Sequence, residues 1–244
     1  MGSFGVIFKH YMKRTIRNRM NTILLFGLPL GIILINLSPM LAEGINLSEF
    51  EGVRFLVIIM TLSFQFFGSA ILSEYITWDF RNEMKWRLMS APVSNRTILM
   101  AISAVSFIMC LLPGVLVLLV MGLIFGVDLG YITVLIPVMI LVCVIAILLT
   151  ALLVLVVPRP KLVGGIHLGA CFVIMFLSGG LIVGISDLPA VLVFFQTYGT
   201  PVSLGVQAVM HGGDIAIRNI GILGVITAVA GLIVFAITRK KALL

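Results

Sequence analysis

The sequence predicts an all-α membrane protein with six transmembrane helices, an N-terminal amphipathic connecting helix and a re-entrant extracellular helical hairpin before the last span. The first reason is composition. The chain has 244 residues, of which 61% are hydrophobic and 10% are charged, whereas about 25% of the residues of a soluble domain are charged. Charge-free runs and the placement of the basic residues supply the other two reasons. A water-soluble fold of this size would have too few charged residues to cover its surface.

The charge-free runs are the candidate spans. Each is about as long as the roughly 20 residues that cross a bilayer as a helix. They cover residues 20–42, 55–73, 97–127, 129–158, 162–186, 188–213 and 219–238. Helices are expected because lipid offers no hydrogen-bond partners to the backbone of an open strand. The apolar stretch 115–120 also lacks the two-residue alternation of a membrane β-barrel.

The placement of charge predicts the topology. Most of the 16 Lys and Arg residues precede the first span, follow the last, or lie between spans two and three and spans four and five. The other loops hold only Arg54 and Arg218, together with most of the acidic residues. Because basic loops are retained on the cytoplasmic side, we expect a multi-pass protein of the cell (plasma) membrane. Both termini would be cytoplasmic, which requires an even number of crossings.

The run 188–213 is the one that does not fit a through-helix. It contains Pro189, Pro201 and a polar centre at 196–200, all unfavourable for a helix exposed to lipid. We expect two short helices that enter the membrane from outside, turn near Tyr198 and Gly199, and leave again. The six spans are then 21–42, 54–75, 98–126, 131–157, 163–185 and 215–237.

Residues 1–20 predict an interfacial connecting helix. Residues on one face follow the i, i+3, i+4, i+7 spacing of an amphipathic helix: Phe4, Ile7, Phe8, Tyr11 and Thr15. The opposite face carries Lys9, Lys13 and Arg17. This pattern is typical of a helix lying at the surface of anionic lipid. An ordinary basic flank that sets topology is a compatible alternative.

The loop 77–97 is the only sizeable cytoplasmic loop that this topology leaves. It holds both tryptophans of the chain, Trp78 and Trp86, and a Glu83–Arg87 pair at i, i+4 spacing. A short helix with an aromatic anchor and both signs of charge suits docking to a soluble partner. The alternative is a connecting loop whose tryptophans anchor at the membrane interface.

Two residues delimit the helices around this loop. Pro92 would end the short charged helix, and Ser94 is a suitable N-cap for the helix that leads into span three. The motif around them is an acidic residue at the end of span two, a charged helix, Arg-Leu, a small residue, Pro-Val-Ser and a basic residue. It corresponds to Glu74, residues 79–87, Arg87-Leu88, Ala91, Pro92-Val93-Ser94 and Arg96.

This motif and the overall topology resemble the permease subunit of an ABC-2 type transporter, which is the transmembrane domain of a type V ABC exporter. The resemblance covers almost the whole chain and implies a single ABC-2 type transmembrane domain over residues 1–244. There are two departures. The Gly-Thr pair common in the coupling segment is replaced around residues 82–84, and the usual Gly-Lys after it is replaced by Met100-Ala101.

The resemblance implies a transport subunit that is not itself an enzyme. Two copies of a P-loop ATPase subunit would bind ATP and Mg, and a second permease copy or a paralogue would complete the transporter. The chain itself would hold no cofactor or metal and bind membrane lipid but no nucleic acid. The sequence agrees, because it has no Gly-x-x-x-x-Gly-Lys-[Ser/Thr] phosphate-binding loop. The implied ATPase-coupling residues are Asp79, Arg81, Glu83, Trp86, Arg87 and Pro92.

The spans carry few ionisable groups, which favours a hydrophobic or amphipathic substrate such as a drug, an antibiotic, a peptide or a lipid-like molecule. Glu74 is the span-two acid expected to matter most, because an intramembrane carboxylate is costly without a partner or water; it could equally lie in water at the membrane boundary. The candidate substrate path is Phe55, Gln65, Phe66, Phe67, Ser69 and Phe176. His167, at the inner end of span five, is expected to be hydrogen-bonded at the interface.

Small residues at i, i+4 spacing let membrane helices approach closely. The resemblance places the permease dimer contact at spans one and five, where the candidate packing residues are Gly165, Gly169, Gly180 and Gly184. Two alternative functions stay open at this point. One is a haem or cofactor exporter permease of the same topology. The other is a secondary transporter, which is less favoured because no acid lies mid-span and no internal repeat is visible.

Overall fold

A computed structural model of the chain describes residues 3–44, 47, 50–81, 93–180 and 189–241. These residues form helices and turns, with no strand among them. The helices are α1 (Ser3–Arg17), α2 (Arg19–Ala42), α3 (Glu51–Gly68), α4 (Ala70–Phe80), α6 (Asn95–Leu119), α7 (Ile132–Val156), α8 (Pro160–Leu177), α9 (Ala190–Phe194), α10 (Pro201–His211) and α11 (Gly213–Lys241). Two π-helical turns, η2 (Val120–Ile124) and η3 (Phe195–Gly199), extend α6 and α9.

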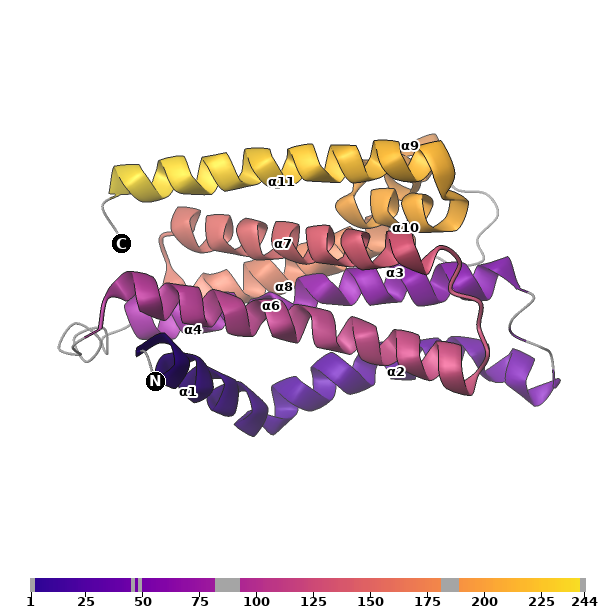
Figure 1. The fold of residues 1–244 in the computed structure, drawn as a ribbon, viewed down its shortest axis with the longest axis horizontal. Helices are drawn as coiled ribbons and strands as arrows, with labels where there is room; N and C mark the ends of the chain where they lie inside the picture. Colours follow the sequence, from indigo (N-terminus) through magenta and orange to yellow (C-terminus); the bar gives the residue numbers. More distant parts are fainter. Residues whose placement is uncertain (1–2, 45–46, 48–49, 82–92, 181–188, 242–244) are drawn as a thin grey trace.

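Within the described residues, six helices are long and apolar enough to cross a membrane, which confirms the predicted fold class. They are Thr22–Ala42, Glu51–Phe80, Asn95–Ile124, Ile132–Val156, Pro160–Leu177 and Gly213–Arg239. Their long axes run side by side (Figure 1). The start of α1 and the end of α11 lie at the same end of the bundle, as expected for an even number of crossings (Figure 1). That this end faces the cytoplasm stays a prediction.

The second span, α3 with α4, is the centre of the bundle. Of the 18 residues in its most apolar stretch, 83% are buried, whereas the corresponding share for the last span, α11, is 11%. Small residues let the neighbours approach it. A Cβ atom on Gly68 would lie 2.8 Å from the Cα atom of Cys110 on α6. A Cβ atom on Gly205 of α10 would lie 2.8 Å from the Leu62 and Val138 side chains. Most of the other helices therefore pack against span two.

The observed spans differ most from the predicted ones at two ends. Span two continues to Phe80, beyond the expected end at residue 75, because the polar groups of this last stretch find protein partners, as described below. Span five ends at Leu177, where Gly179 adopts a positive φ of 91° that stops the helix. Residues 181–185 of the predicted span lie outside the described residues. Ser94 caps α6 as predicted, accepting from the Thr97 amide at 3.2 Å.

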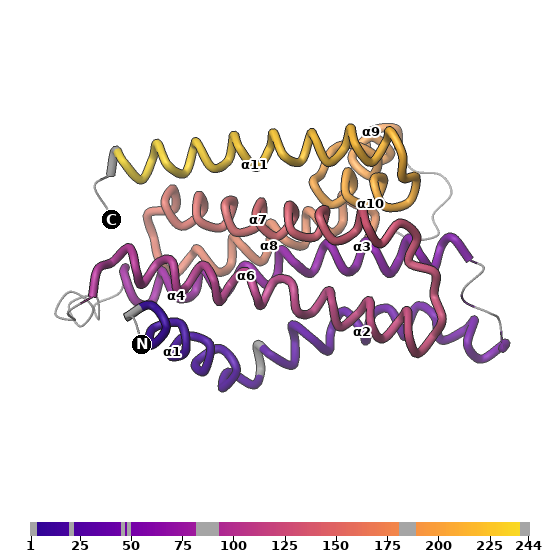
Figure 2. The backbone as a smooth tube through the Cα atoms, viewed as in Figure 1, coloured from indigo at the N-terminus to yellow at the C-terminus, as the bar shows by residue number. Residues whose placement is uncertain are grey.

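Two short helices fill the stretch 190–211, at the end of the bundle opposite the termini (Figure 2). Thr200 joins them in an extended conformation and caps α10 by accepting from the Ser203 amide at 3.0 Å. The Thr200 hydroxyl also lies 2.7 Å from the Ser178 hydroxyl at the end of α8. These bonds give the polar turn protein partners, which a hairpin at membrane depth requires. Entry of this hairpin into the membrane stays a prediction.

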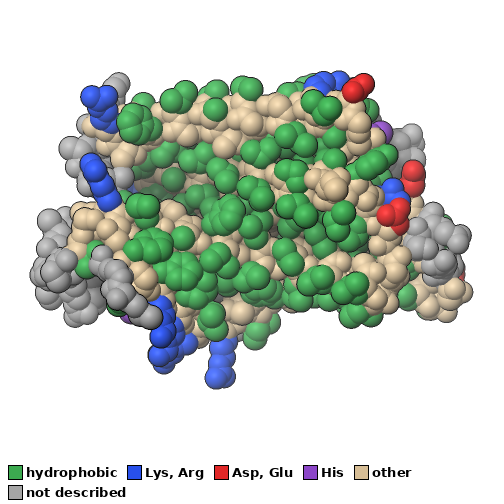
Figure 3. Space-filling model, viewed as in Figure 1, with side chains coloured by type: hydrophobic (Ala, Val, Ile, Leu, Met, Phe, Trp, Pro, Cys, Tyr) green, Lys and Arg blue, Asp and Glu red, His purple; other side chains and the backbone are tan. Residues whose placement is uncertain are grey.

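The surface separates charge from apolar residues. Figure 3 shows a broad region of hydrophobic side chains between the two ends of the molecule. Lys and Arg side chains gather at the end of the bundle where both chain termini lie. The acidic side chains in view lie at the opposite end, beside a few basic ones (Figure 3). There Arg54 forms an ion pair with the Asp128 carboxylate and donates from Nε to the Asp128 backbone carbonyl at 2.9 Å. These contacts hold the α6–α7 connection to the start of α3.

Candidate transport cavity and the clamp on span two

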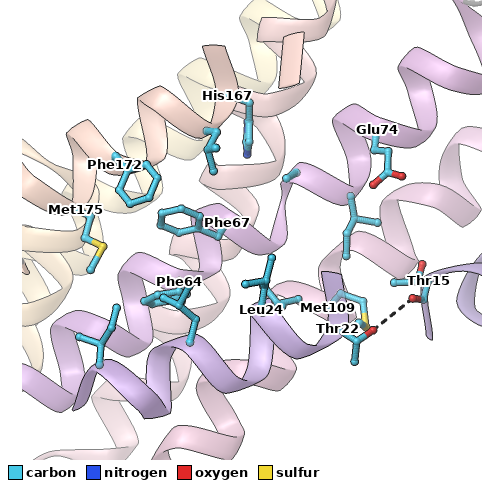
Figure 4. A pocket seen from close by; sticks show the side chains of 16 residues that line it. Thr15, Thr22, Leu24, Phe64, Phe67, Glu74, Met109, His167, Phe172 and Met175 are labelled. Carbon is cyan, nitrogen blue, oxygen red and sulfur yellow. Dashed lines mark hydrogen bonds between the residues drawn. The ribbon is translucent and has the colours of Figure 1, made fainter. Parts of the chain in front are cut away.

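A cavity of about 370 Å³ lies among α2, the second span and α8. Most of its lining is apolar, and residues of α1 and α6 complete it (Figure 4). The lining residues are Thr15, Thr22, Leu24, Leu25, Leu28, Ile32, Phe64, Phe67, Ala70, Ile71, Glu74, Met109, His167, Leu168, Phe172 and Met175. Its size is at the lower end of the range for pockets that hold a small organic molecule.

The two ends of the cavity differ in chemistry. At one end three aromatic rings meet: Phe64 stacks on Phe67 with centroids 5.1 Å apart, and Phe67 meets the edge of Phe172 at 5.2 Å. The other end carries the oxygen atoms of Glu74, Thr15 and Thr22 (Figure 4). A molecule lying along the cavity would therefore contact aromatic carbon at one end and oxygen at the other.

A polar cluster lies where α3 meets α4. Ser69 donates to the Phe66 carbonyl at 2.7 Å and lies 2.8 Å from the Thr150 hydroxyl of α7. His167 of α8 approaches the same carbonyl with Nε2 at 3.2 Å. Because a carbonyl only accepts, this contact requires the proton on Nε2. As expected, His167 is hydrogen-bonded, but it is buried inside the protein. The cluster ties three spans together at the one interruption in span two.

The end of span two that lies on the side of the chain termini is clamped to α1 through Asp79. Tyr11 donates to Oδ2 of Asp79 at 2.7 Å, and Arg14 donates to both carboxylate oxygens at 3.1 Å. The Arg14 guanidinium also lies 4.6 Å above the Tyr75 ring. Burial, and then the hydrogen bond to Asp79, raise the pKa of Tyr11 far above its usual value. The phenol therefore stays protonated and donates throughout the physiological range.

Arg81, the residue that follows the last residue of α4, contacts a different neighbour. Arg81 donates to the carbonyls of Val154 and Val157 at 2.7 Å and to that of Pro158 at 3.1 Å. These carbonyls end α7, where a helix lacks internal partners for its last C=O groups. A cation at this position also interacts favourably with the helix dipole. Asp79 and Arg81 thus tie both α1 and α7 to the point where the chain leaves span two.

The family model of the ABC-2 family transporter protein matches residues 5–236, which is nearly the whole chain. The chain belongs to the ABC-2 transporter family. No curated protein and no solved structure matches it. The family match supports a membrane-spanning ABC-type permease, a transport subunit of a kind that typically works with an ATPase partner.

In this ABC-2 permease the predicted coupling residues divide into two groups. Asp79 and Arg81 are engaged within the chain, in the clamp to α1 and the cap of α7. The others, Glu83, Trp86, Arg87 and Pro92, lie outside the described residues. Tyr11 and Thr15 were expected on the lipid side of the connecting helix. Both are instead buried against protein, since the Thr15 hydroxyl lies 2.7 Å from that of Tyr75.

The predicted substrate-path residues are placed mostly away from the cavity. Phe67 lines it, whereas Phe66, Gln65 and Ser69 are buried on other faces of span two. Phe55 is partly buried near the start of α3, and Phe176 is exposed on α8. Both polar atoms of the Gln65 amide are buried with no hydrogen-bond partner among the described residues. Sequence reasoning missed Phe64, Phe172 and Met175, because aromatic and Met residues also fill ordinary membrane helix contacts.

The glycines predicted to pack at the dimer contact have different surroundings in the structure. Gly165 and Gly169 lie on an exposed face of α8, where an added Cβ atom would meet nothing within 4 Å. Gly180 packs against Met175 of its own chain. Gly184 lies outside the described residues. Only the first pair is therefore available to a second copy in the described part of the chain.

Proposed function

We propose that this chain is the permease subunit of an ATP-driven ABC exporter that moves a hydrophobic or amphipathic molecule out of the cell. Drugs, antibiotics, peptides and lipid-like molecules are the candidate classes. The apolar cavity among α2, the second span and α8, in a chain of the ABC-2 family, is the observation that carries the proposal. Its wall offers aromatic and aliphatic contacts to such a molecule and few of the polar groups that a sugar or an inorganic ion would need.

The energy would come from two copies of a separate P-loop ATPase subunit bound at residues 82–92. These residues follow Arg81, so a force applied to them reaches span two directly. The clamp at Asp79 and the cap by Arg81 would carry the same displacement to α1 and α7. Because Glu74 lies little more than one helical turn before Asp79, the displacement would also change the wall of the cavity.

A second permease copy, or a paralogue, would close the open side of the cavity. Both α2 and α8 line it, and only 22% of the most apolar window of each is buried within the chain. The exposed glycines Gly165 and Gly169 would let the partner helix approach α8 closely. The substrate cavity would then lie between two copies rather than inside one.

Replacing residues 82–91 with a Gly-Ser segment of equal length is expected to abolish binding of the ATPase subunit. The change leaves Asp79 and Arg81 in place, so the clamp and the cap of α7 should survive. The measurement is ATP hydrolysis in the purified complex, together with the stoichiometry of the copurified subunit. The complex purified with the wild-type permease should contain two copies of the ATPase subunit.

The control replaces the exposed residues Glu43 and Glu51, at the opposite end of the bundle, with serine, and should keep full hydrolysis. Melting temperatures of the three purified proteins would show that each is folded. Full ATPase binding by the folded 82–91 variant would contradict the proposed coupling segment.

A further inference from the structure

We infer that His167 is a positioning residue that holds the interruption in span two and so links occupancy of the cavity to the ATPase. The inference rests on the proposed function, because it takes the cavity to be the substrate site, and it assigns that site a route to ATP hydrolysis. The place of His167, on the cavity wall and against the backbone of span two, motivates it.

The first step is the interruption itself. Helix α3 ends at Gly68 and α4 begins at Ala70, so the second span is interrupted at Ser69. Long helices commonly bend at Gly and Ser pairs, and Gly68 and Ser69 form such a pair. The Leu72 amide donates to the Ser69 carbonyl at 3.0 Å, a bond that spans three residues instead of the four of an α-helix. Regular helical bonding is therefore altered at this point.

The second step is the difference between the two halves of span two. The end of α3 lies tightly against α6, since a Cβ atom on Gly68 would be 2.8 Å from the Cα atom of Cys110. The other half, α4, carries Asp79 and leads into Arg81, which contact α1 and α7. A change of direction at Ser69 would therefore move α4, and with it the proposed coupling segment, while α3 stays against α6.

The third step is the position of the His167 side chain, which is 5% exposed and lines the cavity from α8. Its Nε2 atom lies 3.2 Å from the Phe66 carbonyl, which also accepts from the Ser69 hydroxyl at 2.7 Å. Its Nδ1 atom lies 3.4 Å from the Thr150 hydroxyl. Because the same ring belongs to the cavity wall, a ligand that displaces the ring or α8 changes the contact at the interruption.

The cavity wall itself lies on both sides of the interruption. Phe64 and Phe67 line the cavity from α3, whereas Ala70 lines it from α4. On α8, Phe172 meets Phe67 with ring centroids 5.2 Å apart, and His167 contacts the interruption (Figure 4). A molecule between α8 and span two would therefore act on both halves at once, and the contact made by His167 would set how far α4 can turn.

The test measures ATP hydrolysis by the permease–ATPase complex in lipid nanodiscs, with and without the amphipathic dye Hoechst 33342. The readout is the ratio of the two rates, taken for each variant at a dye concentration that saturates its own binding. The dye should stimulate the wild-type complex. His167→Leu removes both ring nitrogens and should lose the stimulation. His167→Gln returns an amide N–H donor near the place of Nε2 and should restore it.

Ser178→Ala is the matched control. Ser178 is buried at the end of α8, and its hydroxyl lies 2.7 Å from that of Thr200. The substitution removes a polar contact between α8 and a neighbouring element, away from the interruption, and should keep the wild-type ratio. Melting temperatures of the purified complexes would show that each variant is folded.

Wild-type stimulation in the folded His167→Leu complex, or a loss that His167→Gln does not restore, would overturn the inference. So would an equal loss in Ser178→Ala, or a wild-type complex that exports the dye but whose hydrolysis the dye does not change. These four outcomes leave the proposed function standing. A wild-type complex that hydrolyses ATP but neither binds nor exports the dye would contradict the proposed function, and the inference would fail with it.

Discussion

Replacing Gly68 with alanine is expected to lower the free energy of unfolding by about 1–3 kcal/mol, the usual cost of overpacking a well-filled core. The added methyl carbon would lie 2.8 Å from the Cα atom of Cys110 and 3.0 Å from the carbonyl oxygen of Met109. These are backbone atoms of α6, so a side-chain rotation cannot relieve the contact. The two helices must move apart, which disturbs the centre of the bundle.

Gly221→Ala on α11 is the matched control for Gly68→Ala. Gly221 is exposed within a membrane-spanning helix, and a Cβ atom there would meet nothing within 4 Å. The same change should be neutral, or stabilising by up to about 1 kcal/mol, because alanine favours helix more than glycine does. Equilibrium unfolding in mixed micelles measures both variants. Equal stabilities would show that α3 and α6 do not pack as closely as described.

Asp79→Ala is expected to cost about 2 kcal/mol of unfolding free energy, because hydrogen bonds to a charged group contribute about 1.5–3 kcal/mol. The substitution removes the acceptor of both Tyr11 and Arg14, and so leaves α1 held to span two mainly by its contacts with Tyr75. The exposed acid at the start of α11, Asp214, provides the control. Asp214→Ala should lose no more than about 1 kcal/mol, from its interaction with the helix dipole.

A double-mutant cycle with Tyr11→Phe tests whether the clamp acts as one unit. The phenylalanine keeps the ring beside Tyr75, where the two rings lie 5.2 Å apart, and removes only the donor hydroxyl. Once Asp79 is absent, the loss of that hydroxyl should cost little. The double variant should therefore be less destabilised than the two single losses added together. Strict additivity would mean that Tyr11 and Asp79 do not interact.

The number and type of the spans could be predicted because they depend on properties local in sequence. Charge-free length identifies a helix that crosses lipid, and Pro189 and Pro201 identify the run that does not continue as one helix. The N-cap at Ser94 was predictable for the same reason, since its partner, Thr97, is three residues away. Such features need no knowledge of which helices touch.

The cavity and the clamp could not be predicted because they depend on contacts between distant segments. Asp79 and Arg81 read as exposed charges of a cytoplasmic loop, yet their partners are 65 or more residues away in sequence. Tyr11 was correctly placed on the apolar face of α1, but periodicity does not say whether lipid or protein covers that face. Whether an aromatic residue of span two lines the cavity depends on the face of the helix on which it lies: Phe67 lines the cavity and Phe66 does not.

The most direct test of the central claim is ATP-dependent export in inverted membrane vesicles that contain the permease and its ATPase subunit. Hoechst 33342, an amphipathic dye that fluoresces in the bilayer, serves as the probe. ATP should cause a decrease in dye fluorescence. Leu168→Trp, which places a larger side chain in the cavity wall, and the 82–91 replacement, which removes the proposed ATPase-binding segment, should both abolish it. Dye movement that persists without the ATPase subunit, or that follows a proton gradient instead of ATP, would contradict the account. So would the absence of any ATP-dependent movement in vesicles where the complex is assembled and hydrolyses ATP.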